Sequence, residues 1–303
     1  MRVRIATRKS ALALWQAEFI RDQLRKSHPD IEVELVPMST SGDRWLSSPL
    51  SEVGGKGLFI KELEQAMMDD AADLAVHSMK DVPADLPAGF VLPVIAFRDD
   101  VRDGLVSRHG GGLDALEKGA VVGSSSLRRQ AQLLTHRPDL VVKPVRGNVN
   151  TRLAKLDDGG YDALMLACAG LERLQMADRI SERISLEVSL PAAGQGALGI
   201  ECREDRADLI EVLGALADAE TCACVTAERA VSRGLGADCS MPLAAYAETG
   251  TDGLRLRARL ASPDGRRVLD ADAIGSDPEA LGAEIAGLLV AQGAEEILAE
   301  LRG

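Results

Sequence analysis

Aromatic side chains are scarce in this chain. Only 3% of its 303 residues are Phe, Trp or Tyr, although 46% are hydrophobic. Its cores must therefore be aliphatic, built from Leu, Val, Ile and Ala. The length is too great for one ordinary core and predicts two or three domains. Apolar runs long enough to span a membrane are also lacking, so we expect no membrane partner.

The sequence lacks the marks of secreted and metal-binding proteins as well. Met1–Ala6 leads directly into a strand-like run with no signal-peptide pattern, so we expect a cytoplasmic protein. Five cysteines are an odd number and do not suggest a disulfide framework. Cys222 and Cys224 have the wrong spacing for a zinc knuckle, and we expect no metal site. We expect these two, Cys168 and Cys202 to be packed.

Acidic residues outnumber basic residues in the chain as a whole, 47 to 35. The net charge of -12 argues against nucleic-acid or membrane-surface binding. Several arginines nevertheless fall in short polar segments between a strand-like run and a helix-like run, where open α/β sheets bind ligands. These segments and their surroundings hold Arg8, Arg128, Arg129, Arg146, Arg152 and Arg173. The pattern predicts a crevice for a small, multiply anionic ligand.

The order of periodic segments predicts two similar α/β lobes with a cleft between them. Each lobe has a β-α-β-α-β run. Strands are expected at about 2–6, 31–38, 73–77, 120–123, 140–145 and 161–167, and helices at about 11–27, 58–70, 127–136 and 149–156. The Ser/Gly-rich residues 42–57 are expected to form a mobile lid loop. Crossings between the lobes are expected near 94–105 and 190–200.

The character of the chain changes near residue 218. A helix at 219–233 is followed by the strictly alternating segment 254–260, which is typical of a half-exposed antiparallel strand. Asp264-Gly265 is a hairpin signal, and one last helix is expected over 278–301. The predicted domains are 1–97 plus 197–216, 98–196, and 217–303, the last being a small α+β domain.

Arg128 and Arg129, which follow Ser124-Ser125-Ser126-Leu127, give the strongest anion signal. Serine caps a helix, and the forked guanidinium matches a carboxylate. The alternative for any one such pair is a capped surface helix with solvated arginines. Recurrence of the pattern at Arg8 and at Arg146 favours ligand binding. Lys56, in a glycine-rich stretch without the spacing of a phosphate loop, is better explained as a lid residue.

Two further candidates have plain alternatives. Ser78, Lys80 and Asp81 follow a strand and could simply form a turn before Pro83. Among many arginines, however, a single carboxylate could stabilise a developing cation. Cys239 could be an unremarkable small residue, or it could be a thiolate nucleophile or attachment point.

Several segments, in this order along the chain, together resemble the hydroxymethylbilane synthase (porphobilinogen deaminase) family. The resemblance covers nearly the whole chain. Its marks are Ile5-Ala6-Thr7-Arg8-Lys9-Ser10, Val53-Gly54-Gly55-Lys56-Gly57, Ala75-Val76-His77-Ser78-Met79-Lys80-Asp81, Gly123-Ser124-Ser125-Ser126-Leu127-Arg128-Arg129, Arg146-Gly147-Asn148 and Leu190-Pro191-Ala192-Ala193-Gly194-Gln195-Gly196.

The resemblance implies two lobes like those of type II periplasmic binding proteins and a third, small domain. It implies a transferase of haem biosynthesis that condenses four porphobilinogens head to tail, with loss of ammonia, to give hydroxymethylbilane. The primer is a dipyrromethane cofactor held by a thioether to Cys239, and Asp81 is the catalytic carboxylate. The implied cofactor-binding residues are Ser10, Lys80, Asp81, Ser126, Arg128, Arg129 and Arg146. The implied substrate-binding residues are Arg8, Ser10, Lys56, Arg146, Arg152 and Arg173. A monomer is expected.

The chain departs from the family pattern beside the cofactor cysteine. Ala237 and Asp238 stand where the family often has two glycines, which adds a carboxylate near the expected attachment point. The competing hypothesis is a non-enzymatic cytoplasmic binding protein or sensor for a small polyanion, which the fold alone would permit. That hypothesis requires neither an adduct on Cys239 nor a role for Asp81.

Overall fold

The computed structural model describes residues 1–40, 60–238 and 240–302. Its contacts divide the chain into two compact units. Unit 1 consists of Met1–Arg98 and Ala197–Cys222, and unit 2 of Asp99–Gly196 and Ala223–Gly303. The division into three domains stays a prediction. Among the described residues, none of the helices combines the length and apolar character that crossing a membrane requires.

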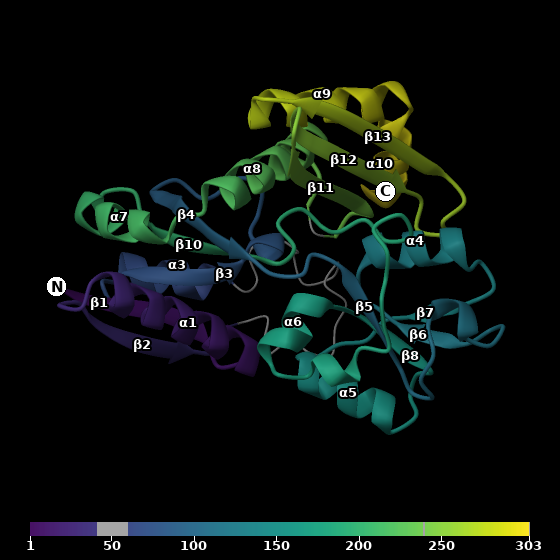
Figure 1. Cartoon of the computed structure of the whole chain (residues 1–303), viewed down its shortest axis with the longest axis horizontal. Helices are drawn as coiled ribbons and strands as arrows, with labels where there is room; N and C mark the ends of the chain where they lie inside the picture. The colour runs from purple at the N-terminus through teal and green to yellow at the C-terminus, as the bar shows by residue number, and fades with distance from the viewer. Residues whose placement is uncertain (41–59, 239, 303) are drawn as a thin grey trace. The chain divides into compact units, whose positions relative to one another are not determined.

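Unit 1 is built on a five-stranded mixed sheet with strand order β2-β1-β3-β10-β4 (Figure 1). Strands β1, β2 and β3 are parallel, and β10 runs antiparallel to both of its neighbours. The strands are β1 (Arg2–Arg8), β2 (Glu32–Met38), β3 (Leu74–Ser78), β4 (Phe90–Arg98) and β10 (Ala197–Arg203). The helices are α1 (Ala11–Ser27), α3 (Lys61–Met68) and α7 (Ala207–Leu213), with short 3-10 turns η1 (Met79–Asp81) and η4 (Gly214–Leu216).

Alternation along the strands of unit 1 decides which helix covers which face. Val3 and Ile5 of β1 pack in one aliphatic cluster with side chains of α1 and α7. Ala6, on the opposite face of the same strand, packs with Leu63 and Met67 of α3. The sheet is therefore covered on both faces, as near-continuous apolar strands require.

Unit 2 contains a second five-stranded sheet, of order β7-β6-β8-β5-β9. Strands β6, β7 and β8 are parallel, and β5 is antiparallel to β8, so this sheet repeats the arrangement of unit 1. The strands are β5 (Asp103–Ser107), β6 (Val121–Gly123), β7 (Val141–Lys143), β8 (Ala163–Ala167) and β9 (Glu182–Arg183). The helices are α4 (Leu127–His136), α5 (Val149–Asp157) and α6 (Cys168–Arg173), with short 3-10 turns η2 (Leu113–Ala115) and η3 (Ala177–Arg179).

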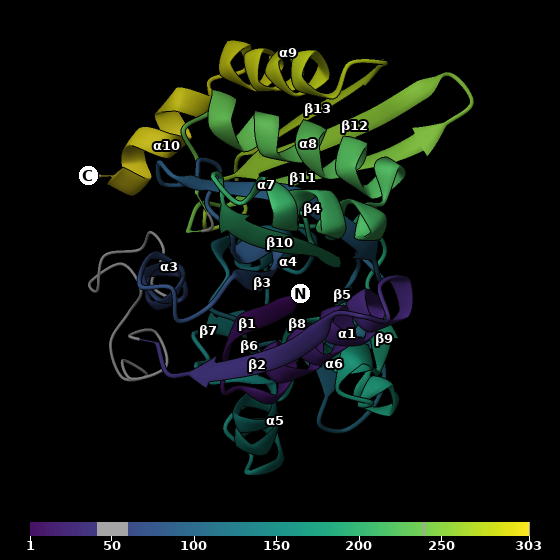
Figure 2. The ribbon, with the colours of Figure 1, turned by 90° about the vertical axis from the view of Figure 1, so that its left-hand side faces the viewer.

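The C-terminal part of unit 2 is a three-stranded antiparallel sheet of order β11-β12-β13, with helices packed on it (Figure 2). The strands are β11 (Leu243–Gly250), β12 (Gly253–Ala261) and β13 (Val268–Gly275), and the helices are α8 (Ala219–Gly234), α9 (Pro278–Ala291) and α10 (Ala294–Arg302). Helices α8 and α9 approach so closely that a Cβ added to Gly282 would lie 2.3 Å from the Cβ of Ala230.

The three-stranded sheet also contacts the α/β part of unit 2, through helix α4. The turn between β12 and β13 rests on α4, where the Gly265 carbonyl accepts a hydrogen bond from Thr135 Oγ1 at 3.0 Å. Gln130 of α4 donates to the Pro263 carbonyl at 3.1 Å. These bonds explain why the two parts form one compact unit.

The predicted elements are largely confirmed, with one clear error at the C-terminal end. The predicted α/β lobes, the small α+β part, the turn at Asp264-Gly265 and the bounds of α1 and α4 agree with the structure. The single helix predicted over 278–301 is wrong: two helices, α9 and α10, occupy this region. Gly293, with φ of 97°, takes a left-handed conformation that ends α9.

Candidate active site

The carboxyl ends of β1 and β3 bring several predicted residues to one edge of the unit 1 sheet. The strands are parallel neighbours, with Ile5 opposite Leu74, so their last residues meet the same edge. Arg8 ends β1, and Ser10 caps α1 by accepting a hydrogen bond from the Ala13 N–H at 3.4 Å. The predicted strand-to-helix junction at Arg8 is thus confirmed.

Beyond β3, the short turn η1 carries Lys80 and Asp81. Its first residue, Met79, is buried and packs over β10, where a Cβ on Gly199 would lie 2.2 Å from the Met79 sulfur. This close approach fixes the turn against the sheet. The Asp81 side chain itself is exposed. A negative charge on a firmly held turn is thereby presented to solvent beside Lys80.

The three parallel strands of the unit 2 sheet end in the other predicted segments. After β6, Ser126 caps α4 by accepting from the Arg129 N–H at 3.5 Å. The Ser125 hydroxyl donates to the Val145 carbonyl at 2.8 Å and accepts from its N–H at 3.0 Å. These two bonds join the loop after β6 to the loop after β7, which carries Arg146. The predicted junctions therefore lie side by side.

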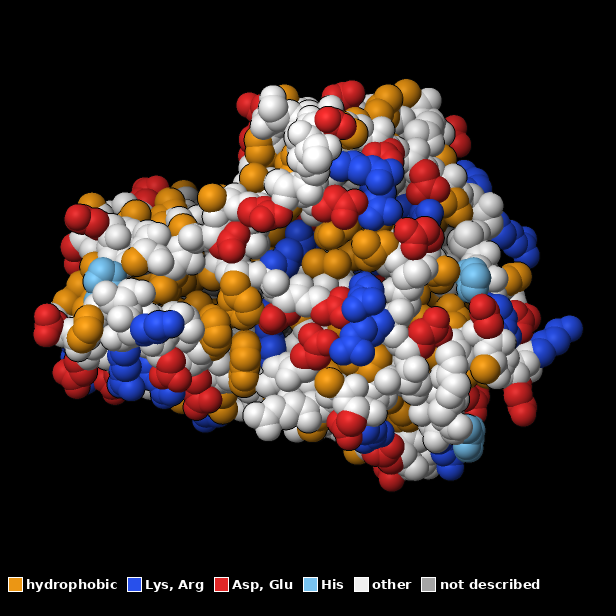
Figure 3. All heavy atoms as spheres, in the orientation of Figure 1, with side chains coloured by type: hydrophobic (Ala, Val, Ile, Leu, Met, Phe, Trp, Pro, Cys, Tyr) orange, Lys and Arg blue, Asp and Glu red, His pale blue; other side chains and the backbone are white. Residues whose placement is uncertain are grey.

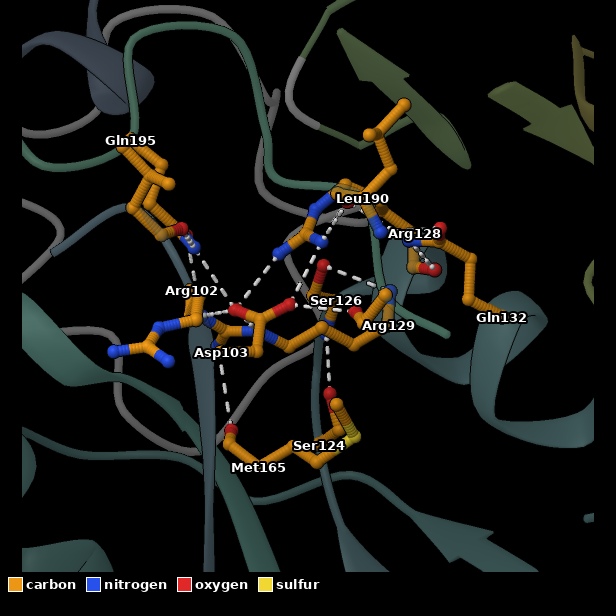
Figure 4. Close-up of polar contacts among 12 residues, drawn as sticks. Arg102, Asp103, Ser124, Ser126, Arg128, Arg129, Gln132, Met165, Leu190 and Gln195 are labelled. Carbon is orange, nitrogen blue, oxygen red and sulfur yellow. Dashed lines mark hydrogen bonds and ion pairs between the residues drawn. The ribbon is translucent and has the colours of Figure 1, made fainter. Parts of the chain in front are cut away.

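Arg128 and Arg129 converge on one buried carboxylate, that of Asp103 (Figure 4). Arg128 donates from Nη1 to Oδ2 at 2.8 Å and from Nη2 to Oδ1 at 3.1 Å, and Arg129 donates from Nε to Oδ1 at 2.8 Å. Ser189 Oγ and Gln195 Nε2 donate to the same carboxylate at 2.8 Å and 3.0 Å. We call these five residues the Asp103 cluster.

The Asp103 cluster carries one more positive charge than negative. Burial alone would raise the pKa of Asp103, which is 0% exposed, but the charges of Arg128 and Arg129 and their hydrogen bonds hold it well below its usual value. Two buried guanidiniums thus face one ionised carboxylate. Figure 3 shows acidic and basic side chains interspersed on the surface in view, whereas both guanidiniums of the cluster are buried.

The donors left over in the Asp103 cluster fit a carboxylate ligand. A guanidinium has five N–H groups. Arg128 uses three of them, on Asp103 and on the Leu190 carbonyl. Arg129 uses three, on Asp103, Met165 and Gln195. The remaining N–H groups have no partner among the described residues and are of the kind that bind carboxylates.

Arg146 and Arg152 lie on either side of the cap of α5. Asn148 caps this helix by accepting from the Thr151 N–H at 2.9 Å, and Arg152 Nε donates to the Gly147 carbonyl at 2.8 Å. Gly147 is required here, since its φ is 113° and a Cβ would lie 2.7 Å from Thr151. The half-buried Arg146 guanidinium has no hydrogen bond or ion pair with the described part of the chain, so it is available to a ligand.

Arg173 differs from Arg146 because it is heavily engaged. It ends α6, is buried, and donates from Nε to Asp99 Oδ2 at 2.7 Å and from Nη2 to the Gly196 carbonyl at 2.6 Å. The Asp99 N–H in turn donates to the same carbonyl at 3.1 Å. Arg173 therefore holds together the two points where the chain enters and leaves the α/β part of unit 2.

Three predictions concern residues that the structure does not describe. The lid loop 42–57, Lys56 within it, and Cys239 all lie outside the described ranges. For the other cysteines the prediction of packing is confirmed at Cys168, Cys202 and Cys224, which are buried, and wrong at Cys222, which is exposed. Burial raises the pKa of Cys168 to about 12, so this thiol stays protonated.

Sequence reasoning missed Asp103, Ser189 and Gln195 as partners of the arginines. Asp103 lies in the predicted crossing segment and starts a strand that runs antiparallel to β8, so the N-terminal end of this strand meets the carboxyl ends of the parallel strands. The only available signal was the need for a counter-charge near two adjacent buried arginines. Nothing local to Asp103 could have supplied it.

Comparison with known proteins agrees with this geometry. Residues 3–211 match the family model "Porphobilinogen deaminase, dipyromethane cofactor binding domain", and residues 222–291 match "Porphobilinogen deaminase, C-terminal domain". This chain belongs to the porphobilinogen deaminase family. Among curated relatives, the porphobilinogen deaminases of Bordetella parapertussis and Bordetella bronchiseptica are each 56% identical over 302 residues, which covers 99% of this chain and 96% of theirs.

Membership of the porphobilinogen deaminase family confirms the predicted family, the predicted transferase class and the dipyrromethane cofactor. It disfavours the non-enzymatic binding protein. Similar solved structures include an Escherichia coli aliphatic sulphonate binding protein (15% identity, TM-score 0.42, 77% of this chain and 70% of that one). A probable amino-acid binding protein of Bacillus subtilis has 12% identity and a TM-score of 0.44, over 71% and 90% of the two chains. At such scores the fold class rests on the sheet topology itself.

Proposed function

We propose that this chain is a hydroxymethylbilane synthase that condenses four porphobilinogen molecules head to tail, with release of ammonia. The primer is a dipyrromethane attached through a thioether to Cys239, and the protein acts as a cytoplasmic monomer. Family membership supports the activity. The observation within the structure that supports it most is the Asp103 cluster, whose excess positive charge and spare donors suit a ligand with several carboxylates.

The arginines bind the acidic side chains of the pyrroles. Each pyrrole unit brings two carboxylates, so a growing chain accumulates negative charge that water or guanidinium groups must offset. Arg128, Arg129 and Arg146 offer charge-assisted, forked hydrogen bonds at one edge of the unit 2 sheet. Ser126, the N-cap of α4, adds a hydroxyl.

The remaining residues of the proposal serve the carboxylates of the cofactor, the substrate and the growing chain. Arg8 and Ser10 contribute from the edge of the unit 1 sheet, and Arg152 and Arg173 from unit 2. Lys80 lies beside Asp81 and contacts the cofactor. Lys56 contributes one further cation.

Asp81 provides the negative charge that the reaction needs. Loss of ammonia from porphobilinogen leaves a cationic species, and a carboxylate in reach of the ring N–H stabilises it. When bound, the cofactor supplies a covalent primer to which each new pyrrole is joined. Asp81 accepts a hydrogen bond from the pyrrole N–H. It lies on a turn that Met79 anchors to the sheet, so the position of its carboxylate is preorganised.

Intact mass spectrometry of the purified protein tests the proposal. We expect an excess equal to two porphobilinogens less two ammonias, and no such excess in Cys239→Ala. If the purified protein has an unmodified mass, porphobilinogen is added and the mass is measured again. If no adduct forms even then, or if Cys239→Ala carries the same adduct, the proposed attachment and primer are wrong.

A further inference from the structure

Asp103 occupies a position that no local feature of the sequence explains. It begins β5, is fully buried, and accepts five hydrogen bonds from four side chains. Four of the donors come from Arg128, Arg129 and Gln195, and the fifth is the Ser189 hydroxyl. Its oxygen atoms are therefore saturated by protein donors, so the carboxylate cannot itself contact a ligand.

The two arginines would diverge without this carboxylate. They are consecutive residues in the first turn of α4, and successive residues on a helix point about 100° apart. Figure 4 shows both guanidiniums turned toward Asp103 instead. The bidentate contact of Arg128 and the Nε contact of Arg129 supply the one charged partner that the two long side chains share, and so help to restrict their rotamers.

Asp103 also reduces the net positive charge of the Arg128 and Arg129 pair. Two guanidiniums buried side by side repel each other, and the described residues supply no second carboxylate to either of them. Asp103 offsets one positive charge and leaves the other. A carboxylate ligand that binds the spare N–H groups then completes the pairing, whereas a second protein carboxylate would have removed the attraction for it.

We propose that Asp103 is the positioning residue that presents Arg128 and Arg129 to the carboxylates of the dipyrromethane cofactor. This inference rests on the proposed function. Asp103 acts through the arginines and does not touch the cofactor. Ser189 and Gln195 also donate to the carboxylate, so the segment before β10 takes part in the same arrangement.

The test replaces Asp103 by Asn, which keeps the shape and removes the charge. Apo protein is produced in cells that cannot make porphobilinogen and is then incubated with porphobilinogen. The adduct on the chain is followed by intact mass. We expect Asp103→Asn to form the adduct at least about tenfold more slowly than the wild type, because misdirected guanidiniums no longer bind the acidic side chains together.

A thermodynamic cycle separates positioning from simple structural support. The melting temperature is measured for the wild type and Asp103→Asn, each with and without Cys239→Ala, which prevents loading. If Asp103 positions the arginines for the cofactor, loading raises the melting temperature less in Asp103→Asn than in the wild type. The proposal is refuted if Asp103→Asn lowers the melting temperature by the same amount with and without Cys239→Ala and adduct formation is normal.

Asp73→Asn is the matched control. Asp73 is a buried carboxylate of unit 1 that also accepts hydrogen bonds from two arginines, Arg4 and Arg206. The control lowers stability but leaves the rate of adduct formation unchanged. If it slows loading as much as Asp103→Asn does, general destabilisation is the cause and the inference is wrong.

Ser189→Ala keeps the test decisive if Asp103→Asn does not fold. This change removes one of the five donors to Asp103 and no charge. We expect slower adduct formation by about twofold to fivefold, and a normal rate overturns the inference. A wild type that takes up no adduct at all overturns the proposed function instead, so the two failures are distinguishable.

Discussion

Asp81, in the turn after β3, and Asp103, the first residue of β5, have surroundings that give them different chemistry. Asp81 is exposed on a firmly anchored turn, so its charge can meet a substrate. Asp103 is buried among donors, which lower its pKa well below the usual value and leave it no free lone pair directed outward. One carboxylate is suited to catalysis and the other to positioning.

Asp81→Asn should separate binding from turnover. The amide keeps the size of the side chain but cannot stabilise a developing cation, so we expect turnover to fall by roughly 100-fold or more with substrate binding retained. Steady-state kinetics with porphobilinogen, together with an affinity measured on the same protein, give the result. The control is Asp85→Asn, an exposed aspartate four residues further on, which should leave turnover unchanged. Near wild-type turnover in Asp81→Asn would remove Asp81 from the mechanism.

Capping residues show what could be read from the sequence at this scale. Ser10, Ser126 and Asn148 each cap the helix that follows them, because a side-chain oxygen accepts a local backbone N–H. Such bonds depend only on neighbouring residues. The partnership of Asp103 with Arg128 spans 25 residues and depends on the direction of β5 in the sheet, which no local pattern reveals.

At the scale of elements, periodicity located most helices and strands but not every end. The bounds of α1 agree with prediction because apolar spacing, the serine cap and the following His28-Pro29 all coincide. The break between α9 and α10 was missed because apolar residues continue across it, while Gly293 alone changes the backbone direction. A single glycine is too weak a signal against such a pattern.

Helix α3 carries a carboxyl that links stability to pH. Desolvation, helped by the charge of Glu201 and opposed by His77, raises the pKa of Glu64 to about 7. Glu201 is itself buried and paired with His77 at 2.7 Å. Because the folded protein keeps a proton that the unfolded chain loses above about pH 4.5, this group makes stability fall as pH rises from about 4.5 to 7.

Glu64→Gln should remove that loss. Relative to the wild type, we expect the variant to gain roughly 1 kcal/mol in free energy of unfolding between about pH 4.5 and pH 8, after allowance for solvent screening of this half-buried group. Urea unfolding across this range measures it. Glu18→Gln, an exposed position on α1, should show no such trend. A constant difference between Glu64→Gln and the wild type at all pH values would contradict the assignment.

At the scale of the whole molecule, the chain divides into two units whose internal contacts differ in kind. In unit 1 a single sheet is covered on both faces. In unit 2 a second such sheet and a three-stranded sheet share contacts through α4 and the turn at Gly265. Sequence reasoning separated these two parts, because each has its own periodic pattern, and it had no means of detecting the tertiary contacts that join them.

Gly265→Ala should therefore loosen more than the three-stranded sheet to which its turn belongs. Gly265 has φ of 72°, and an added Cβ would lie 2.5 Å from the Thr135 N atom and 2.8 Å from the Ala131 carbonyl oxygen, both in α4. Strain and clash together should cost about 2 kcal/mol. Hydrogen exchange should accelerate both in β11–β13 and around α4, because the turn can no longer rest on that helix, whereas β1–β3 of unit 1 should keep their protection.

Gly250→Ala, where the nearest atom to an added Cβ lies at 3.6 Å, is the control and should change neither region. Acceleration confined to β11–β13 would mean that the two parts of unit 2 open independently despite the bonds between them.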